Sequence, residues 1–174
     1  MSLNKRKNIY VKLVFVMLLG MVGLLSVIQA IELSAEANKY GYEGHVLLQK
    51  GHFNQAKVKL EKAQSLGDVK AMHSLGIMYI HGDGVKKSYS KAMTYFKKSY
   101  KHGYVNAAYD IGVMYKNGES VKKSVKTAKK YYTIAAKNNY RLAQIELAKI
   151  YASQGNKKQF EYWTKKAKSH KGTR

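Results

Sequence analysis

The chain has 174 residues and is strongly basic, with 32 lysine and arginine residues against 10 aspartate and glutamate residues and a formal net charge of +22. A chain of this length holds at most one domain and a leader. It contains no cysteine and no proline, so disulfides, thiolate chemistry and a lipoprotein-type anchor are excluded. The folded part must therefore be stabilised by packing alone.

The first 31 residues have the layout of an export signal. Four basic residues and no acid occur in residues 1–12, and the uncharged run Leu13–Ile28 follows. A helix of this run spans about 24 Å, short of the roughly 30 Å hydrocarbon core, and an extension to Ile31 nearly closes the gap. Residues 1–31 are therefore predicted to be a signal peptide or a retained signal-anchor, and both alternatives stay open.

The flanking charges predict the orientation of this segment. Lys5, Arg6, Lys7 and Lys12 precede the apolar run, whereas Glu32 and Glu36 follow it before any basic residue. Basic residues stay on the cytoplasmic side of a membrane. We therefore expect a cytoplasmic N-terminus and, in a bacterium, a remainder that lies in the periplasm or on the inner membrane facing it.

The centre of the chain is one 36-residue unit that occurs twice. Ala71–Asn106 and Ala107–Leu142 align without a gap and are identical at thirteen positions. Self-similarity at a fixed period of this size is the signature of a repeat array. Repeat units of this kind stack on one another to bury a continuous core.

Each unit divides into two predicted helices. In the first copy an apolar stripe with helical spacing ends at Gly82-Asp83-Gly84, and a second stripe begins after Ser88. Ser124 occupies the matching place in the second copy, and a serine there accepts hydrogen bonds from first-turn amides. The first stripe contains Ala71, Leu75, Met78 and Tyr79, and the second contains Ala92, Met93, Phe96, Ser99 and Tyr100.

These motifs resemble the Sel1-like repeat family, a relative of the tetratricopeptide repeats. The shared marks are Ala-x3-Leu-Gly-x2-Tyr in Ala71–Tyr79, Gly-x-Gly-Val in Gly82–Val85 and Lys-Ala-x2-Tyr-Phe in Lys91–Phe96. Ser88 and Ser124 stand where that family often has aspartate. The resemblance implies an all-α fold, an α-solenoid of stacked antiparallel helix hairpins, here preceded by the N-terminal hydrophobic helix.

The flanking segments extend the array at falling quality, as the end units of solenoids do. Residues 32–70 are predicted to form an atypical first repeat with tetratricopeptide spacing, and residues 143–168 a degenerate capping repeat. Between them, residues 71–106 and 107–142 are the two Sel1-like units. Residues 169–174 are predicted to be a frayed tail.

The basic charge has two interpretations. Only Arg6, Arg141 and Arg174 of the 32 basic residues are arginine, and lysine is a hydrated point charge without the planar fork of arginine. The lysines form a solvated outer surface, or their field attracts an anionic partner such as an acidic protein, phospholipid headgroups or an envelope polymer. Scarce arginine and predicted export argue against nucleic acid as a partner.

Motifs of catalysis are missing from the sequence. It has no Gly-rich phosphate loop, no Gly-x-Ser-x-Gly elbow and no His-Glu-x-x-His. The six histidines, at positions 45, 52, 73, 81, 102 and 170, do not reach a recognised metal spacing. We therefore expect no enzymatic activity, no cofactor and no metal site.

The favoured hypothesis is a non-catalytic protein–protein interaction scaffold that acts outside the cytoplasm and binds an acidic partner. Stacked hairpins curve, and their first helices line the concave surface. Similarity to tetratricopeptide repeats implies that exposed positions of those helices contact the ligand: His45, Lys70, His73, His81, Tyr109, Lys116 and Lys149. The alternatives are a cationic envelope-binding module and an immunity or accessory factor for a secreted effector. The identity of the partner and the oligomeric state stay open.

Overall fold

The computed structural model describes residues 3–169, with the backbone alone for residues 3–16, 18 and 19. These residues form eight α-helices without a strand, as predicted, and most of the expected tail lies outside them. In chain order the helices are α1 (Leu3–Gln49), α2 (Phe53–Ser65), α3 (Val69–His81), α4 (Tyr89–Lys101), α5 (Ala107–Asn117), α6 (Val125–Lys137), α7 (Arg141–Ser153) and α8 (Lys157–Ser169).

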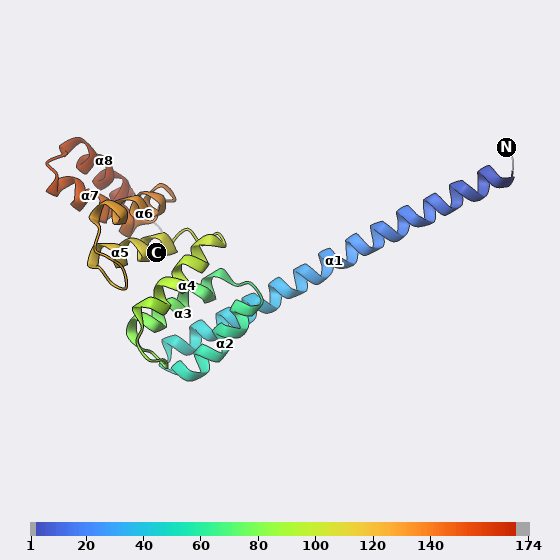
Figure 1. The fold of residues 1–174 in the computed structure, drawn as a ribbon, viewed down its shortest axis with the longest axis horizontal. Coiled ribbons are helices and arrows are strands. Elements are labelled where there is room, and N and C mark those ends of the chain that lie inside the picture. Colours follow the sequence, from blue (N-terminus) through green and yellow to red (C-terminus); the bar gives the residue numbers. More distant parts are fainter. Residues whose placement is uncertain (1–2, 170–174) are drawn as a thin grey trace.

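Successive helices pack as hairpins. Contacts are densest within the pairs α1–α2, α3–α4, α5–α6 and α7–α8, and α2–α3, α4–α5 and α6–α7 join each hairpin to the next. Figure 1 shows the hairpins following one another from the cyan end to the red end of the chain. The predicted solenoid is confirmed.

Small residues let the two helices of an internal hairpin approach closely. A Cβ on Gly76 would lie 2.6 Å from the Phe96 ring, and a Cβ on Gly112 would lie 2.7 Å from the Tyr132 ring. Ala92 and Ala128 are fully buried on the partner helices. The aromatic rings therefore lie directly on bare helix backbone, a packing mode that excludes larger side chains at the two glycines.

The second helices begin at the predicted serines. Ser88 Oγ accepts a hydrogen bond from Lys91 N at 3.3 Å, and Ser124 Oγ accepts one from Thr127 N at 3.1 Å. Both serines satisfy amides that the first turn of a helix leaves unpaired. The two N-caps confirm the expectation drawn from the repeat alignment.

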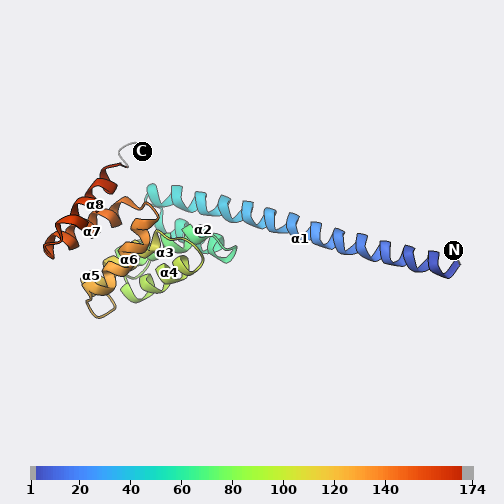
Figure 2. The same cartoon turned by 90° about the horizontal axis from the view of Figure 1, so that it is seen from above.

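The N-terminal hydrophobic helix is part of the first repeat. α1 projects from the hairpins as one uninterrupted rod (Figure 2), and its C-terminal part packs against α2. Among the α1 residues whose side chains the structure describes, Ala37, with 5% exposure, is the first buried apolar one. Within the described residues, the segment Gly20–Gln49 is long and apolar enough to cross a membrane. The apolar segment and the repeats therefore share one helix.

Candidate functional site

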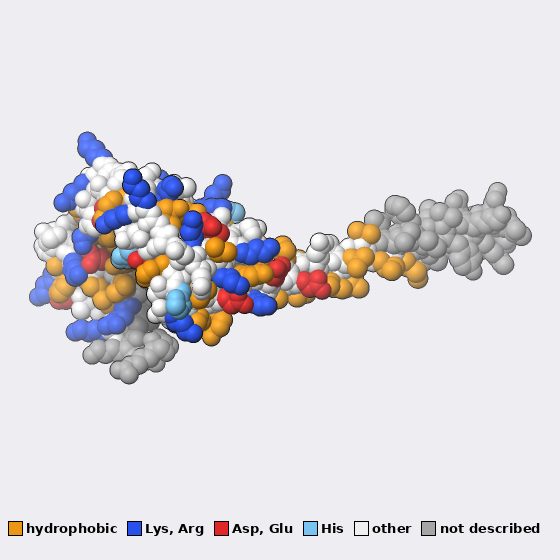
Figure 3. All heavy atoms as spheres, turned by 90° about the horizontal axis from the view of Figure 1, so that it is seen from below, with side chains coloured by type: hydrophobic (Ala, Val, Ile, Leu, Met, Phe, Trp, Pro, Cys, Tyr) orange, Lys and Arg blue, Asp and Glu red, His pale blue; other side chains and the backbone are white. Residues whose placement is uncertain are grey.

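The seven predicted site residues all belong to the first helix of a hairpin. His45 lies on α1, Lys70, His73 and His81 on α3, Tyr109 and Lys116 on α5, and Lys149 on α7. We call the surface formed by α3, α5, α7 and the packed part of α1 the first-helix face. Lysine side chains are spread over the surface of the repeats, with acidic side chains among them (Figure 3).

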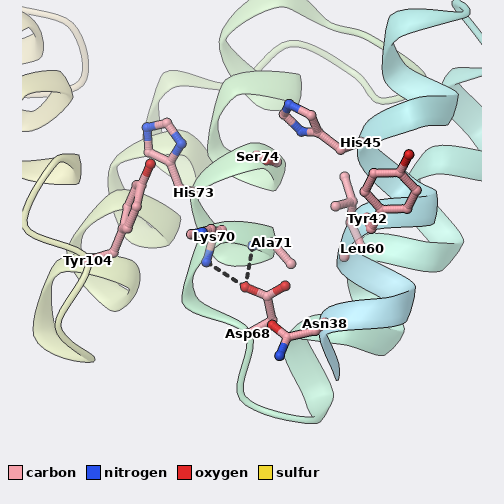
Figure 4. A pocket seen from close by; sticks show the side chains of 11 residues that line it. Asn38, Tyr42, His45, Leu60, Asp68, Lys70, Ala71, His73, Ser74 and Tyr104 are labelled. Carbon is pink, nitrogen blue, oxygen red and sulfur yellow. Dashed lines mark hydrogen bonds between the residues drawn. The ribbon is translucent and has the colours of Figure 1, made fainter. Parts of the chain in front are cut away.

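Three of the seven residues meet at one pocket between α1 and α3. His45, Lys70 and His73 line a cavity of about 520 Å³. Figure 4 shows His45 on the α1 side of this cavity and His73 on the opposite side, beside Tyr104. We call it the α1–α3 pocket. The α1–α3 pocket thus brings three of the seven predicted residues to one open cavity.

An acidic side chain closes one end of the α1–α3 pocket. Asp68 is the N-cap of α3, and its Oδ1 accepts hydrogen bonds from Lys70 N at 2.7 Å and Ala71 N at 3.1 Å (Figure 4). A Cβ on Gly41 would overlap the other carboxylate oxygen, Oδ2. The Asp68 carboxylate can therefore pack against α1 only because residue 41 is a glycine.

His73 also joins two neighbouring hairpins. Its Nε2 lies 2.7 Å from Asp110 Oδ2 on α5. The His73 ring packs between Phe96, at 5.4 Å between ring centroids, and Tyr104, at 5.1 Å. His73 is half-buried, and its ring is largely used in contacts that hold α3 to α5.

Lys116 and Lys149 meet at a common carboxylate on α7. Glu146 accepts hydrogen bonds from Lys116 Nζ at 2.5 Å and from Lys149 Nζ at 2.8 Å. Glu146 has 9% exposure. Burial raises the pKa of its carboxyl, but the hydrogen bonds and charges of the two lysines outweigh burial and bring the pKa below its ordinary value of 4.5. The two lysines therefore act first as partners of Glu146.

The remaining predicted residues lie apart from the α1–α3 pocket. Tyr109 is half-buried against Tyr132 and Tyr140, with ring centroids 5.7 Å and 5.1 Å away. Burial, and then the charge of Glu146, raise the pKa of its phenol. His81 is the last residue of α3 and is exposed.

Two acidic residues of the first-helix face were missed from the sequence. Asp110 and Glu146 occupy the same position of the 36-residue unit, and each contacts a basic side chain of the preceding first helix, His73 and Lys116 respectively. The sequence does hold a signal for them, because the two acidic residues are 36 residues apart, one repeat length. Ser74 is at the same position one unit earlier. No group of three His, Asp or Glu residues that could hold a metal ion occurs in the part of the chain that the structure describes.

This architecture defines a class, the helix-hairpin solenoid proteins, and the comparisons with known proteins specify it further. Residues 69–104 and 105–140 each match the Sel1 repeat. The chain therefore contains two Sel1 repeats, as its motifs predicted. Among curated proteins, none matches the chain.

Two solved structures are similar over most of the chain. A Sel1 repeat protein from Oxalobacter formigenes has 27% sequence identity and a TM-score of 0.71, over 78% of this chain and 57% of that one. A protective antigen present in uropathogenic Escherichia coli strains and displaying an SLR fold has 26% identity and a TM-score of 0.71, over 86% of this chain and 33% of that one. The chain thus spans between a third and three fifths of the length of these relatives.

Proposed function

We propose that the protein is a non-catalytic scaffold that holds an acidic segment of a partner protein on its first-helix face. Sel1 repeats form a scaffold of the protein-interaction type. The observation that carries the proposal is the α1–α3 pocket, because Lys70 and His45 of the first-helix face line this cavity of about 520 Å³ together. Exposed cationic side chains around a pocket steer and orient an anionic ligand.

We further propose that α1 places this scaffold outside the cytoplasm, as a signal peptide or as a retained anchor. The apolar side chains of α1 support this assignment, since residues such as Met21, Val22 and Leu25 are more than half exposed. A water-soluble helix rarely presents so continuous an apolar surface. The basic residues before the apolar run favour a cytoplasmic N-terminus and repeats on the other side.

A second candidate function, a cationic module that binds anionic envelope surfaces, is favoured by the second helices. Lys97 and Lys98 on α4 and Lys130 on α6 are exposed, and so are Lys165 and Lys166 on α8. Such a surface would bind any anionic layer without requiring the α1–α3 pocket. Its binding would collapse as ionic strength rises.

One experiment separates the two candidates by the location of the lysines. The first-helix variant carries Lys70→Gln, Lys116→Gln and Lys149→Gln, with Glu146→Gln added so that no buried carboxylate is left unpaired. The matched control carries Lys97→Gln and Lys98→Gln on α4 and loses the same net charge. Binding of glutamate-rich peptides to the full chain in detergent micelles is measured by fluorescence anisotropy.

The proposal predicts that the first-helix variant binds these peptides about tenfold more weakly and that the control changes affinity less than about twofold. An equal loss in both variants would favour the cationic surface module. Peptides that do not bind the unmodified chain at all would refute the scaffold proposal.

A further inference from the structure

The junctions between hairpins repeat one arrangement in which an aromatic ring fills a slot between two first helices. At the α5–α7 junction the ring belongs to Tyr109, which packs on Tyr132 at 5.7 Å and on Tyr140 at 5.1 Å between centroids. Glu146 on α7 is near enough for its charge to raise the pKa of the Tyr109 phenol, after burial has done so. Tyr109 therefore closes this junction.

The α3–α5 junction has the same construction one unit earlier. His73 takes the place of Tyr109 and packs on Phe96 at 5.4 Å and on Tyr104 at 5.1 Å. Asp110 takes the place of Glu146 and lies 2.7 Å from His73 Nε2. Each of these residues precedes its counterpart by one 36-residue unit. The slot is thus a property of the repeat and is filled by a ring with a polar edge.

The α1–α3 junction has the slot without the ring. Gly44 packs on Leu60 as Gly76 packs on Phe96, and this register places Gly41 where α3 has His73 and α5 has Tyr109. The other slot positions hold Leu60, Asp68 and Ser74. All four of these residues line the α1–α3 pocket of about 520 Å³. The pocket therefore occupies the place from which the repeat's own ring is missing.

We infer that the α1–α3 pocket binds an aromatic side chain of a partner protein, a tyrosine within an acidic segment, in place of the missing ring. This inference rests on the proposed function and names the anchor residue of the same site. A tyrosine fits the slot because Tyr109 occupies the equivalent place in the α5–α7 junction, two junctions further along the chain. Buried aromatic anchors in a pocket carry most of the binding energy of many protein interfaces.

The chemistry of the lining suits the two ends of a tyrosine differently. Leu60 is buried beneath the pocket and offers an apolar surface for the ring. The Asp68 carboxylate uses Oδ1 for the α3 amides, so Oδ2 is oriented toward Gly41 and available to accept a bond from a phenol O–H. A phenol donates to a carboxylate in a charge-assisted hydrogen bond. A phenylalanine would fill the volume without this bond.

Acidic residues beside the anchor would meet basic side chains at the rim of the pocket. Lys70 and His45 line the same pocket and are exposed. Figure 4 shows that they belong to opposite walls, His45 to α1 and Lys70 to α3. An extended segment that crosses the pocket would thus pass the Lys70 ammonium on one side of its anchor and the His45 imidazole on the other, and an acidic residue beside the anchor would pair with Lys70.

The first test compares peptides that differ only at the anchor. Short peptides of alternating glutamate and serine carry one central tyrosine, phenylalanine or alanine, and their affinity for the full chain in detergent micelles is measured by isothermal titration calorimetry. We expect the alanine peptide to bind about thirtyfold more weakly than the tyrosine peptide. We expect the phenylalanine peptide to bind about fivefold more weakly, because it lacks the phenol donor.

The second test fills the slot from within the chain. The double variant Gly41→Tyr with Asp68→Tyr copies Tyr109 and Tyr140 of the α5–α7 junction, where Tyr140 is the N-cap of α7. It should fold and lose the preference for the tyrosine peptide over the alanine peptide. Val58→Tyr, which adds a ring at an exposed position of α2, is the matched control and should keep the full preference.

A third variant changes the specificity of the pocket. Ser74→Asp copies Asp110, which binds a histidine ring at the α3–α5 junction, and should favour a histidine anchor over tyrosine by about tenfold. Ser74→Asn is the neutral control of the same size, and it should leave the tyrosine preference unchanged. A selective gain by the aspartate variant cannot arise from a folding defect.

The outcomes separate the two proposals. Peptides that bind equally with tyrosine or alanine, but more weakly to the first-helix lysine variant, would overturn the aromatic slot and leave the scaffold proposal standing. If no acidic peptide binds, the scaffold proposal fails, and the slot is then judged with p-cresol, the tyrosine side-chain analogue, by the shift of the Leu60 methyl signals. Loss of that shift in the Gly41→Tyr, Asp68→Tyr variant would support the slot, and absence of any shift in the unmodified chain would overturn it.

Discussion

The internal hairpins and the last hairpin use different means of packing. In α3–α4 and α5–α6 a glycine lies under an aromatic ring, as Gly112 does under Tyr132. Asn156 caps α8 by accepting a hydrogen bond from Gln159 N at 3.1 Å, and this register places Ala148 and Thr164 at the glycine and ring positions of α7–α8. Phe160 takes the place of the buried Ala92 and Ala128 and has 39% exposure.

The consequence is a looser fit at the end of the solenoid. Ala148, Phe160 and Thr164 line a groove of about 290 Å³ between α7 and α8. Polar contacts instead join the last hairpin to its neighbour, since the buried Gln144 donates from Nε2 to Ala136 O at 3.1 Å and Glu146 accepts from Lys116. The comparison teaches that a ring on a glycine fits the two helices of an internal hairpin together, whereas the last hairpin buries Leu147 and Trp163 without that fit and adds polar contacts to its neighbour.

The largest expected effect breaks the steric fit at an internal hairpin. Tyr132→Ala removes a fully buried ring and should lower the free energy of unfolding by about 4 kcal/mol. Thr164→Ala, the matched change in the last hairpin, should cost less than about 1 kcal/mol. Urea unfolding of the full chain in detergent, followed by circular dichroism, measures both.

Tyr132→Phe is the control for the hydroxyl. Within the described residues Tyr132 Oη is buried without a hydrogen-bond partner, so its removal should not destabilise the protein. Equal losses for Tyr132→Ala and Thr164→Ala would contradict the distinction between internal and terminal packing.

A smaller effect is expected from overfilling the same contact. Gly112→Val places its Cβ 2.7 Å from the Tyr132 ring and 3.3 Å from Ala128 O, and it should cost about 2 kcal/mol. Ala148→Val adds volume beside the groove of the last hairpin and should cost less than about 1 kcal/mol. Thermal unfolding gives the ranking, and a larger loss for Ala148→Val than for Gly112→Val would show that the last hairpin is packed as tightly as the others.

The smallest expected effect concerns the polar contacts of the last hairpin. Glu146→Gln should cost about 1 to 2 kcal/mol near neutral pH, because charged hydrogen bonds from Lys116 and Lys149 are lost. Since folding lowers the pKa of Glu146 from 4.5, its stabilisation is complete above pH 4.5 and is lost as pH falls below that value. The difference between the unmodified chain and the variant should therefore narrow in acid.

Glu161→Gln is the control for this measurement. Glu161 and Lys157 are exposed and 4.0 Å apart, so the substitution should change stability by less than about 0.5 kcal/mol at any pH. A pH-independent difference for Glu146→Gln would mean that its effect comes from packing rather than from charge.

The sequence sufficed for the helices of the two internal repeats and for the starts of α4 and α6, because burial is periodic and caps are local. Ala71, Leu75 and Met78 are spaced as one helix stripe, and all three are buried. Ser88 can be identified as a cap from its place before the next stripe, since the hydrogen bond that it accepts reaches only three residues along the chain. Such features need no knowledge of the neighbouring unit.

The site could be predicted only as a set of candidate positions. The spacing of exposed positions on one helix does not reveal which of their side chains bind residues of the next hairpin. His73, for example, contacts Asp110, which is 37 residues away. The same limit applies to Lys116, whose partner Glu146 is 30 residues away on α7. The α1–α3 pocket was equally out of reach, because it depends on Gly41 being set against residues of α3.

Because α1 is one continuous helix, helix geometry fixes how the repeats are rotated relative to its apolar half. Each residue of an α-helix rises by about 1.5 Å along the helix axis and is rotated by about 100° about that axis. A single residue inserted between Ile31 and Ala37 would therefore rotate the array of hairpins by about 100° about the α1 axis and move it by only about 1.5 Å along that axis. Any membrane or partner that binds the apolar half of α1 therefore also sets the direction in which the first-helix face points.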